Sequence, residues 1–258
     1  MPPIHPPFKG EPDAPIALES SDVHGAAPLH LHESHAFMMV RKGTCRYRFA
    51  GREIPLVPGD ILLMPAHKPR GCIADKRFAH FSVRFYPGRL ESRRNDRRPE
   101  PAEDADGALH PSILEQWNAL SAPIADETDA AALAGLPVQA ELSRFGILRL
   151  NPDEAGRAAA MLDAMHAEQQ QRLPGHERVL RAYLEILLVL FSRVCSRQLT
   201  LAEEFQSSRK ALIKDAIVFI EAHLAEPIRF EEIAKNSSLS PNYFRTVFKE
   251  ATGMSPVD

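Results

Sequence analysis

The chain has 258 residues, of which 44% are hydrophobic and 25% charged, a composition typical of a globular protein with one large or two modest domains. Its 31 Lys and Arg side chains and 34 Asp and Glu side chains leave a net charge of −3. This balance excludes a uniformly basic protein but permits one local nucleic-acid interface. The three cysteines, Cys45, Cys72 and Cys195, form no Cys-x-x-Cys pair, so we expect neither a disulfide framework nor a thiolate zinc site.

The N-terminal residues have neither the basic nor the apolar region of a signal peptide. The longest apolar run, at residues 186–191, is far shorter than the roughly 20 residues that cross a bilayer. We therefore expect a soluble, cytoplasmic protein that makes no contact with a membrane.

Short runs of alternating apolar residues fill positions 28–86. The runs at 36–40, 45–49, 61–64 and 80–85 are separated by glycine and proline turns. Many short strands with such turns predict a β-sandwich or a small barrel. The run at 61–64 is apolar on both faces, which is typical of a buried strand.

A break follows, in which residues 88–110 are rich in Gly, Pro, Arg and Asp. Lys and Arg crowd into positions 76–98, and no basic residue follows between 99 and 141. This pattern is typical of a solvated surface insertion, which we place at about 88–135. A basic patch that touches DNA phosphates is the alternative.

Beyond this insertion the apolar spacing becomes helical. Asn151-Pro152 offers an N-cap and a proline at the first helical position, which predicts a helix at 153–172 that ends before Pro174-Gly175. The predicted buried face of this helix consists of Ala158, Met161, Leu162 and Met165.

A second predicted helix, at 176–198, carries two apolar stripes. One stripe consists of Val179, Tyr183, Ile186, Leu190 and Val194, and the other of Leu180, Leu184, Leu187, Phe191 and Cys195. A helix with apolar residues around most of its circumference must be covered on two sides. One stripe can cover the β domain. The other predicts a homodimer seam, with a monomeric core helix as the alternative.

Three shorter helices are predicted at 211–224, 230–235 and 241–252, the last beginning with the N-cap and first-turn proline of Ser240-Pro241. The third helix has an apolar side made of Tyr243, Phe244, Val247 and Phe248. Its other side presents Asn242, Arg245, Thr246 and Lys249 at positions i, i+3, i+4 and i+7. These groups suit base edges in a major groove, with Lys249 placed for a phosphate. The pattern predicts a helix-turn-helix, and a small three-helix bundle with a polar surface is the alternative.

Three motifs in this region favour the helix-turn-helix over the three-helix bundle, because they resemble a known family. They are Glu232-Ile-Ala234, Leu239-Ser-Pro-Asn-Tyr-Phe-Arg245 and Phe248-Lys-Glu-Ala-Thr-Gly-Met-Ser-Pro256. Over about residues 211–257 they resemble the first helix-turn-helix of the AraC/XylS family of transcriptional regulators. The resemblance implies base contacts from Asn242, Arg245 and Thr246. The whole DNA-binding set that we predict is Ser240, Asn242, Tyr243, Arg245, Thr246 and Lys249.

Two departures from this family's pattern stand out. Arg229 occupies a position where a hydroxyl N-cap is usual. The resemblance also implies a DNA-binding domain with two helix-turn-helix units joined by a long helix. In this chain that long helix would begin at Asp258. We therefore expect a truncated domain. Residues 209–258 hold seven basic and seven acidic side chains, so we expect this half alone to bind DNA weakly.

The β region resembles a second known domain. His30-Leu-His32-Glu33, Gly43 and the segment from Pro58-Gly59 to Pro65 are similar to the cupin barrel that senses ligands in many AraC-type regulators. This resemblance implies an effector site in the barrel. It also implies that the helices at 153–198 are the dimerisation helices.

Metal-binding cupins use a His-x-His pair, a Glu and a later His. Ala36 occupies the expected Glu position and Arg70 the expected position of the later His, so we expect no metal and no other cofactor. His30 and His32 should alternate onto one strand face, with His35 out of phase. The predicted effector-binding residues are His30, His32, Arg70, His80 and Arg84. Arg70 favours a small polar effector such as a sugar or a carboxylate.

Together these patterns predict an α+β protein in three parts. Residues 1–150 form a cupin-like effector-sensing β-barrel, residues 151–200 a helical linker and dimerisation region, and residues 209–258 an all-α helix-turn-helix segment. The predicted function is a homodimeric, ligand-responsive transcription regulator that binds double-stranded DNA and has no catalytic residues. The alternatives are a metal-dependent cupin enzyme and a dimeric small-molecule binding module that does not touch DNA.

Overall fold

The structure, a computed structural model, describes residues 14–30, 32–49, 52–68, 70–86, 113–122, 124, 142–222, 233 and 240–252. The chain divides into two compact units, Met1–Leu199 and Thr200–Asp258, each of which is described by itself. Within the described ranges, none of the helices combines the length and the apolar character that a bilayer span requires.

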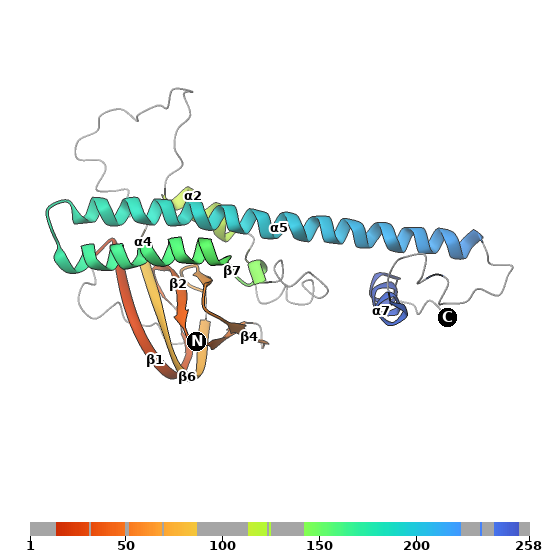
Figure 1. Cartoon of the computed structure of the whole chain (residues 1–258), viewed down its shortest axis with the longest axis horizontal. Helices are drawn as coiled ribbons and strands as arrows, with labels where there is room; N and C mark the ends of the chain where they lie inside the picture. The colour runs from red at the N-terminus through yellow and green to blue at the C-terminus, as the bar shows by residue number, and fades with distance from the viewer. Residues whose placement is uncertain are drawn as a thin grey trace, which may run out of the picture. The chain divides into compact units, whose positions relative to one another are not determined.

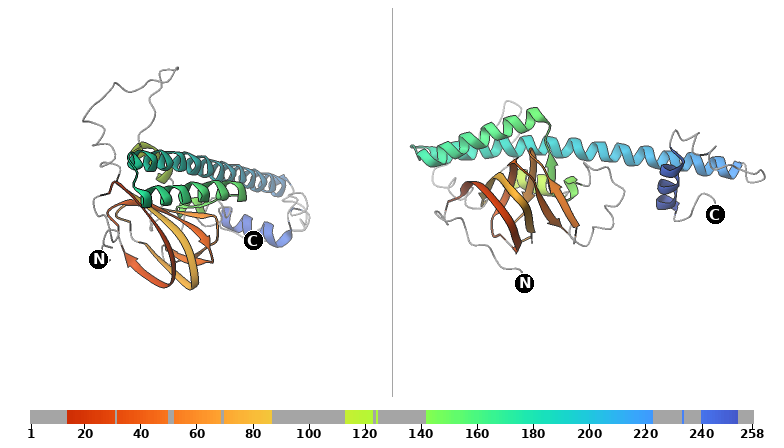
Figure 2. Two further views of the ribbon diagram at one scale, coloured as in Figure 1. Left: turned by 60° about the vertical axis from the view of Figure 1, so that its left-hand side comes forward. Right: turned by 60° about the horizontal axis from the view of Figure 1, so that its bottom comes forward.

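The first unit is built on an antiparallel sheet, which has seven strands in the part of the chain that the structure describes (Figure 1). The strands run in the order β4-β3-β6-β2-β5-β7, and β1 pairs with β6 outside this path. Figure 2 shows that the sheet is strongly curved. The strands are β1 (Ile16–His30), β2 (His35–Lys42), β3 (Cys45–Phe49), β4 (Arg52–Leu56), β5 (Asp60–Met64), β6 (Arg70–Phe85) and β7 (Ile147–Arg149).

β6 is the strand that joins the parts of this sheet. Its second half lies between β1 and β2, where Val83 is opposite Leu18 on one side and Phe37 on the other. Its first half pairs with β1 and with β3. Because β6 is 16 residues long, a single strand can pair with three others.

The predicted strands at 36–40, 45–49, 61–64 and 80–85 are confirmed as β2, β3, β5 and part of β6. β1, β4 and β7 lie outside the predicted runs. β7 is three residues long and is held by pairing with β5, so its strand conformation depends on a distant partner rather than on local pattern.

The two faces of the sheet carry separate hydrophobic clusters. In β2, Phe37 and Met39 belong to one cluster, and Met38 and Val40 belong to the other, as the alternation of strand side chains requires. All five residues of β5 are buried, which confirms the predicted strand with two buried faces.

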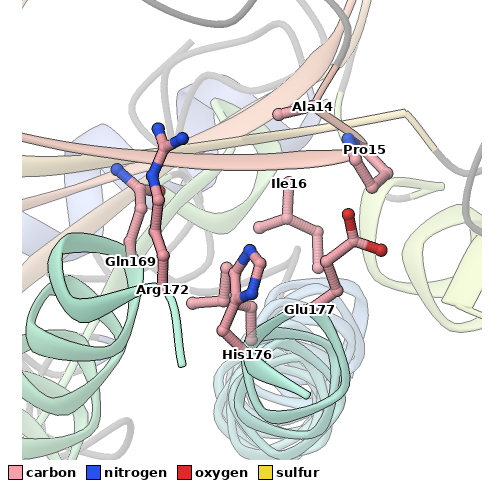
Figure 3. A pocket seen from close by; sticks show the side chains of 8 residues that line it. Ala14, Pro15, Ile16, Gln169, Arg172, His176 and Glu177 are labelled. Atoms are coloured by element: carbon pink, nitrogen blue, oxygen red, sulfur yellow. The ribbon is translucent and has the colours of Figure 1, made fainter. Parts of the chain in front are cut away.

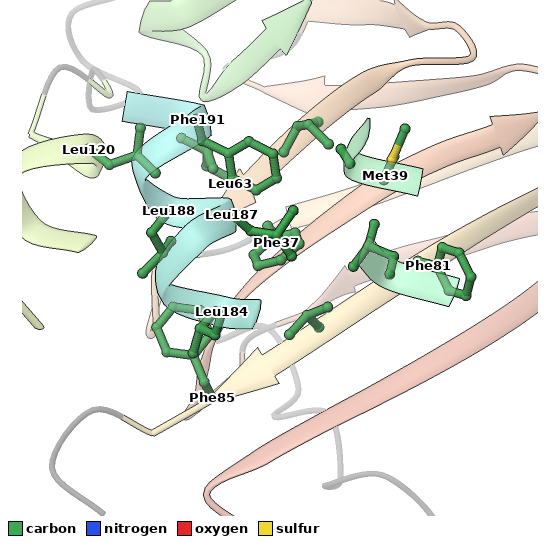
Figure 4. Packing of buried hydrophobic residues seen from close by; sticks show 14 of the residues in the cluster. Phe37, Met39, Leu63, Phe81, Phe85, Leu120, Leu184, Leu187, Leu188 and Phe191 are labelled. Atoms are coloured by element: carbon green, nitrogen blue, oxygen red, sulfur yellow. The ribbon is translucent and has the colours of Figure 1, made fainter. Parts of the chain in front are cut away.

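The helix-facing cluster joins one face of the sheet to the helices. Figure 4 shows Phe37, Leu63 and Phe85 from the strands packed against side chains of the long helix α5 (His176–Ala222). The ring of Phe191 from this helix meets Phe37 edge-on, with 5.0 Å between centroids. The inner cluster lies on the opposite face and consists of Ala36, Met38, Val40, Cys45, Tyr47, Ile54, Leu56, Leu62, Met64, Ala74, Phe78, Leu142, Phe145 and Ile147.

α4 (Pro152–Gln171) and α5 lie side by side on the helix-facing side of the sheet (Figures 1 and 2). The predicted start of α4 is confirmed. The Asn151 side chain accepts a hydrogen bond from the Glu154 N–H (2.9 Å), and the Glu154 carboxylate accepts one from the Asn151 N–H (3.0 Å). Arg172, with φ of 50°, ends the helix in a left-handed conformation.

A short helix, α2 (Ile113–Ser121), adds to the same cluster. Its Trp117 is fully buried and meets the ring of Phe85 edge-on, with 5.0 Å between centroids. Trp117 is therefore a core residue.

α5 is one helix of 47 residues, so the prediction of separate helices at 176–198 and 211–224 is wrong. The physical reason is visible in the sequence, because no glycine or proline occurs between Gly175 and Pro227. The polar stretch near 200–210 interrupts the apolar pattern without breaking the backbone hydrogen bonds.

The two predicted stripes of α5 have different surroundings. The stripe from Leu180 to Cys195 is buried against the first unit, as predicted. In the other stripe, Val179 and Ile186 are exposed (37% and 50%), while Val194 is buried and belongs to the core, contrary to the prediction. Val189, which is 39% exposed, extends the exposed stripe.

The second unit contains the end of α5, Ile233 and the helix α7 (Pro241–Thr252). Its hydrophobic cluster consists of Ile213, Ala216, Ile233, Phe244 and Phe248. Of the predicted helix at 230–235, only Ile233 lies within the described residues, and it is helical and buried.

Candidate functional site

A strip of polar side chains lies on the inner face of the sheet. Phe81, Val83 and Phe85 of β6 point to the helix-facing cluster, so the alternate residues of this strand lie on the opposite face. Cross-strand pairing places Ser21 opposite His80, and Glu19 opposite Ser82. We call Glu19, Ser21, His80, Ser82 and Arg84 the polar strip.

An apolar wall borders the polar strip on its β2 side. Ala36, Met38 and Val40 are the cross-strand partners of Arg84, Ser82 and His80, respectively, and all three are buried in the inner cluster. A few convergent polar groups beside an apolar wall are the usual features of a small-molecule site.

His80 is the strip residue with an unsatisfied ring nitrogen. Its Nδ1 is buried and has no hydrogen-bond partner among the described residues. The ring stacks on Phe78, with 4.9 Å between centroids. Burial lowers the pKa of His80, although the nearby Glu19 carboxylate raises it in part. The imidazole is therefore held mainly neutral, and it can accept or donate a hydrogen bond to a ligand.

Arg84 and Glu19 bring opposite charges to the strip. Burial lowers the pKa of the Arg84 guanidinium, while Glu19 and Tyr86 raise it. Arginine stays protonated in proteins despite such shifts, so Arg84 provides a fixed positive charge. Ser21 donates a hydrogen bond to the Glu19 carboxylate (2.8 Å). The strip therefore offers a cation, an anion, hydroxyls and a neutral imidazole.

The structure divides the predicted effector residues between two places. His80 and Arg84 lie together on the strip, whereas Arg70 pairs with His30 at the opposite end of β6. Arg70 and His80 are ten positions apart, or about 33 Å along an extended strand. The side chains of His30 and Arg70 lie outside the described part of the chain. The single predicted pocket is therefore not supported as one cluster.

Glu19, Ser21 and Ser82 lie outside the predicted set, although they flank His80 and Arg84. Glu19 and Ser21 lie on β1, which begins before the region that the turn signals mark as β. The alternation of the large apolar residues Ile16 and Leu18 with Ala17 and Glu19 is the signal that indicates this strand.

The histidines near the start of β2 are not aligned as predicted. β1 ends at His30, and buried His32 belongs to the connection before β2, so the two do not alternate on one strand. His35 is out of phase, as expected. Its Nδ1 accepts a hydrogen bond from the Ala66 N–H (3.1 Å), and its ring packs against Trp117. Among the described residues, no three potential metal ligands gather.

Cys45 and Cys72 meet within the inner cluster. The hydrogen bond from Cys72 and burial both raise the pKa of the Cys45 thiol. None of the three cysteines forms a disulfide in the part of the chain that the structure describes. A raised pKa keeps the thiol protonated, which disfavours a role as nucleophile or metal ligand.

A separate shallow hollow lies where β1 begins and where α4 ends beside the start of α5 (Figure 3). The apolar residues Ile16 and Leu180 line it, together with polar side chains that include Arg172 and Glu177. Ile16 belongs to the helix-facing cluster, so this hollow is on the opposite face of the sheet from the polar strip.

In the second unit, α7 has the predicted two-faced character. Phe244 and Phe248 are buried, while Asn242, Arg245, Thr246 and Lys249 are exposed. The Ser240 carbonyl accepts a hydrogen bond from the Phe244 N–H (2.9 Å), which begins the helix. The Tyr243 side chain lies outside the described residues. The polar face of the helix is confirmed, and the DNA contacts of its residues stay predictions.

Comparison with protein families gives two matches, one in each unit. Residues 16–140 match the AraC-like ligand binding domain. Residues 220–258 match the bacterial regulatory helix-turn-helix proteins of the AraC family. With the antiparallel sheet and the helices, these matches confirm the predicted α+β chain with a cupin-like sensing domain and a helix-turn-helix.

Solved structures of cupins align with part of the chain. A cupin-2 domain protein from Shewanella frigidimarina NCIMB 400 aligns at 18% identity and a TM-score of 0.26, over 27% of this chain and 69% of that one. A cupin 2 conserved barrel domain protein from Salinispora arenicola CNS-205 aligns at 17% identity and a TM-score of 0.28, over 33% and 75%. The polyketide cyclase RemF from Streptomyces resistomycificus aligns at 21% identity and a TM-score of 0.26, over 27% and 53%. No curated protein matches the chain.

Proposed function

Since the chain belongs to the AraC family of ligand-responsive, DNA-binding transcription regulators, we propose that it binds its effector on the polar strip. The effector is a small polar molecule such as a sugar or a carboxylate. The protein acts as a homodimer in the cytoplasm, on double-stranded DNA, and catalyses no reaction.

The observation that carries the effector proposal is the row of His80, Ser82 and Arg84 on one face of β6, beside an apolar wall. A guanidinium binds a carboxylate through two parallel hydrogen bonds, which makes Arg84 the anchor for an acidic ligand. The His80 ring and the Ser82 hydroxyl suit ligand hydroxyls. That His30, His32 and Arg70 also contact the effector stays a prediction.

A titration with paired ligands tests this proposal. Hydroxylated carboxylates and the neutral sugars of matching carbon skeleton are titrated into the protein by calorimetry. Arg84→Met should weaken the binding of a carboxylate by about tenfold to a hundredfold, because a charged hydrogen bond is lost. Arg41→Met is the matched control, since Arg41 is exposed and lies over the Phe81 ring on the other face. Equal losses in both variants would contradict the proposal.

Elemental analysis of the purified protein separates this regulator from a metal-dependent enzyme. We expect less than stoichiometric iron, zinc or manganese. One equivalent of metal that disappears in the double variant His30→Ala, His32→Ala would favour the enzyme instead.

The homodimer proposal rests on the exposed stripe of α5. Val179, Ile186 and Val189 expose apolar surface along one side of a helix whose other side is buried. A second copy of the same helix presents the same stripe, so a symmetric seam would bury both.

Sedimentation velocity tests the dimer. Ile186→Glu with Val189→Glu should give a monomer at micromolar concentration, while Ala160→Glu on the exposed side of α4 should leave the dimer intact. Leu187 is unsuitable for this test because it is fully buried in the core. A wild-type protein that sediments as a monomer would contradict the proposal.

A further inference from the structure

Two residues of α5 bind to neighbouring elements immediately before the boundary between the units, which lies after Leu199. The Gln198 amide donates a hydrogen bond to the main-chain oxygen of Arg149 in β7 (3.1 Å) and accepts one from the Ser143 hydroxyl (2.7 Å). The Arg197 guanidinium donates two hydrogen bonds to the Glu154 carboxylate, at 2.7 and 3.0 Å. We call Arg197 and Gln198 the anchor.

Arg149, whose main chain binds Gln198, also takes part in a second ion pair on the sheet. The Arg149 guanidinium donates two hydrogen bonds of 2.9 Å each to the carboxylate of Asp60, which also accepts one from the Val57 N–H. Asp60 and Gln198 are almost fully buried. A buried polar network with paired members specifies one geometry, because breaking any bond leaves a buried group without a partner.

A continuous row of cross-strand partners joins this network to the polar strip. Ser82 of β6 is opposite Met38 of β2, which is opposite Leu62 of β5, which is opposite Ile147 of β7. Ile147 lies two positions before Arg149 on the same strand. The strip therefore lies at one end of a row across four neighbouring strands, and the other end is the strand to which Gln198 bonds.

Beyond the anchor, α5 has no buried side chain until Ile213 in the described part of the helix. The helix nevertheless continues to Ala222 without a glycine or proline. The anchor and the adjacent Leu199, which packs against the helix-facing cluster, are therefore the last attachments of α5 within the first unit.

We propose that Gln198 is a positioning residue of the effector response, which transmits a change at the polar strip through β7 to the end of α5. This inference rests on the proposed function, since it assigns a regulatory role to the same strip. It predicts that a change of the side chain at position 82 alters the amide hydrogen exchange of the segment 200–222.

A double-variant cycle read by hydrogen exchange of the full chain tests this coupling. Ser82→Leu adds side-chain volume on the polar strip, so the substitution perturbs the strip without the need for an effector. It should change the exchange rates of amides in 200–222 by about twofold to thirtyfold, the range of coupling through protein networks. In the Gln198→Met background, the same perturbation should leave these rates unchanged.

Gln169→Met is the matched control. The Gln169 amide also bonds to the main chain of a strand, accepting from the Leu18 N–H (2.7 Å) and donating to the Leu18 oxygen (2.8 Å). Its loss should cost similar hydrogen bonds at the far end of α4, yet the response of 200–222 to Ser82→Leu should persist. If Ser82→Leu does not fold, Arg84→Met takes its place.

Three results would overturn the inference: no response in the wild-type background, an undiminished response with Gln198→Met, or an equal loss with Gln169→Met. A merely structural Gln198 would raise exchange near 198 and leave the response to Ser82→Leu intact. The cycle uses neither effector nor DNA. Its failure is therefore distinct from failure of the ligand titration, which tests the proposed function itself.

Discussion

The same helix, α5, meets two very different environments in the two units. In the first unit, its Leu184, Leu187 and Phe191 are fully buried against a sheet that carries hydrophobic clusters on both faces. In the second unit, its Ile213 and Ala216 share a cluster with three other buried side chains among the described residues. Small cores leave little stability to spare, so equal damage should have unequal consequences in the two units.

The largest expected effect is the loss of a buried ring in the smaller core. Phe248→Ala should cost about 3–5 kcal/mol, because it leaves a cavity beside Phe244, against which Phe248 packs. We expect the second unit to unfold while the first stays folded. Calorimetry should show that the upper transition is unchanged. A parallel shift of both transitions would mean that the units do not unfold separately.

The matching change in the larger core is Phe191→Ala. It removes the edge-on contact with Phe37 and should also cost about 3–5 kcal/mol of the first unit's stability. We expect the first unit to stay folded at room temperature with a lower melting temperature. Urea unfolding followed by the fluorescence of Trp117, the protein's one tryptophan, reports this unit alone.

The exposed face of α7 should show an intermediate effect, on DNA binding rather than stability. Arg245→Ala should cost about 1–3 kcal/mol and relax the preference at one base pair, as expected for a lost bidentate contact. Lys249→Ala should weaken all sequences alike and reduce the salt dependence by about one charge. Binding to single-base operator variants at two salt concentrations separates these outcomes. An equal loss on every variant with Arg245→Ala would show that this face does not read bases.

The smallest expected effect is a pH dependence confined to the first unit. Burial lowers the pKa of His80, against the opposing influence of Glu19, so the folded state binds fewer protons than the unfolded state below the ordinary value of 6.5. Stability should therefore fall as the pH drops from 6.5 to the lowered pKa of the folded state, and then level off. His80→Gln should remove this part of the pH dependence in urea titrations. An unchanged profile would contradict the assignment.

Local signals in the sequence predict much of the helical structure. The Asn151-Pro152 cap and its capping partner Glu154 define the start of α4, and Ser240-Pro241 defines the start of α7. Both faces of α7 follow from spacing, since Phe244 and Phe248 are buried while Arg245 and its polar neighbours are exposed. The absence of glycine and proline between Gly175 and Pro227 also indicates that α5 is continuous. The change of apolar pattern near residue 200 makes this signal hard to recognise.

The sequence by itself thus determined the strands β2, β3 and β5 and the polar face of α7, because each depends on neighbours within one turn or one strand. The two kinds of domain followed from the resemblance of its motifs to known families. Only the tertiary structure decided which polar side chains share a site. Glu19 meets Ser82 through the register of β1 on β6, and the same register places His30 and Arg70 far along the strand from Arg84. Register between distant segments is fixed by the packing of both faces of the sheet, which no local pattern contains.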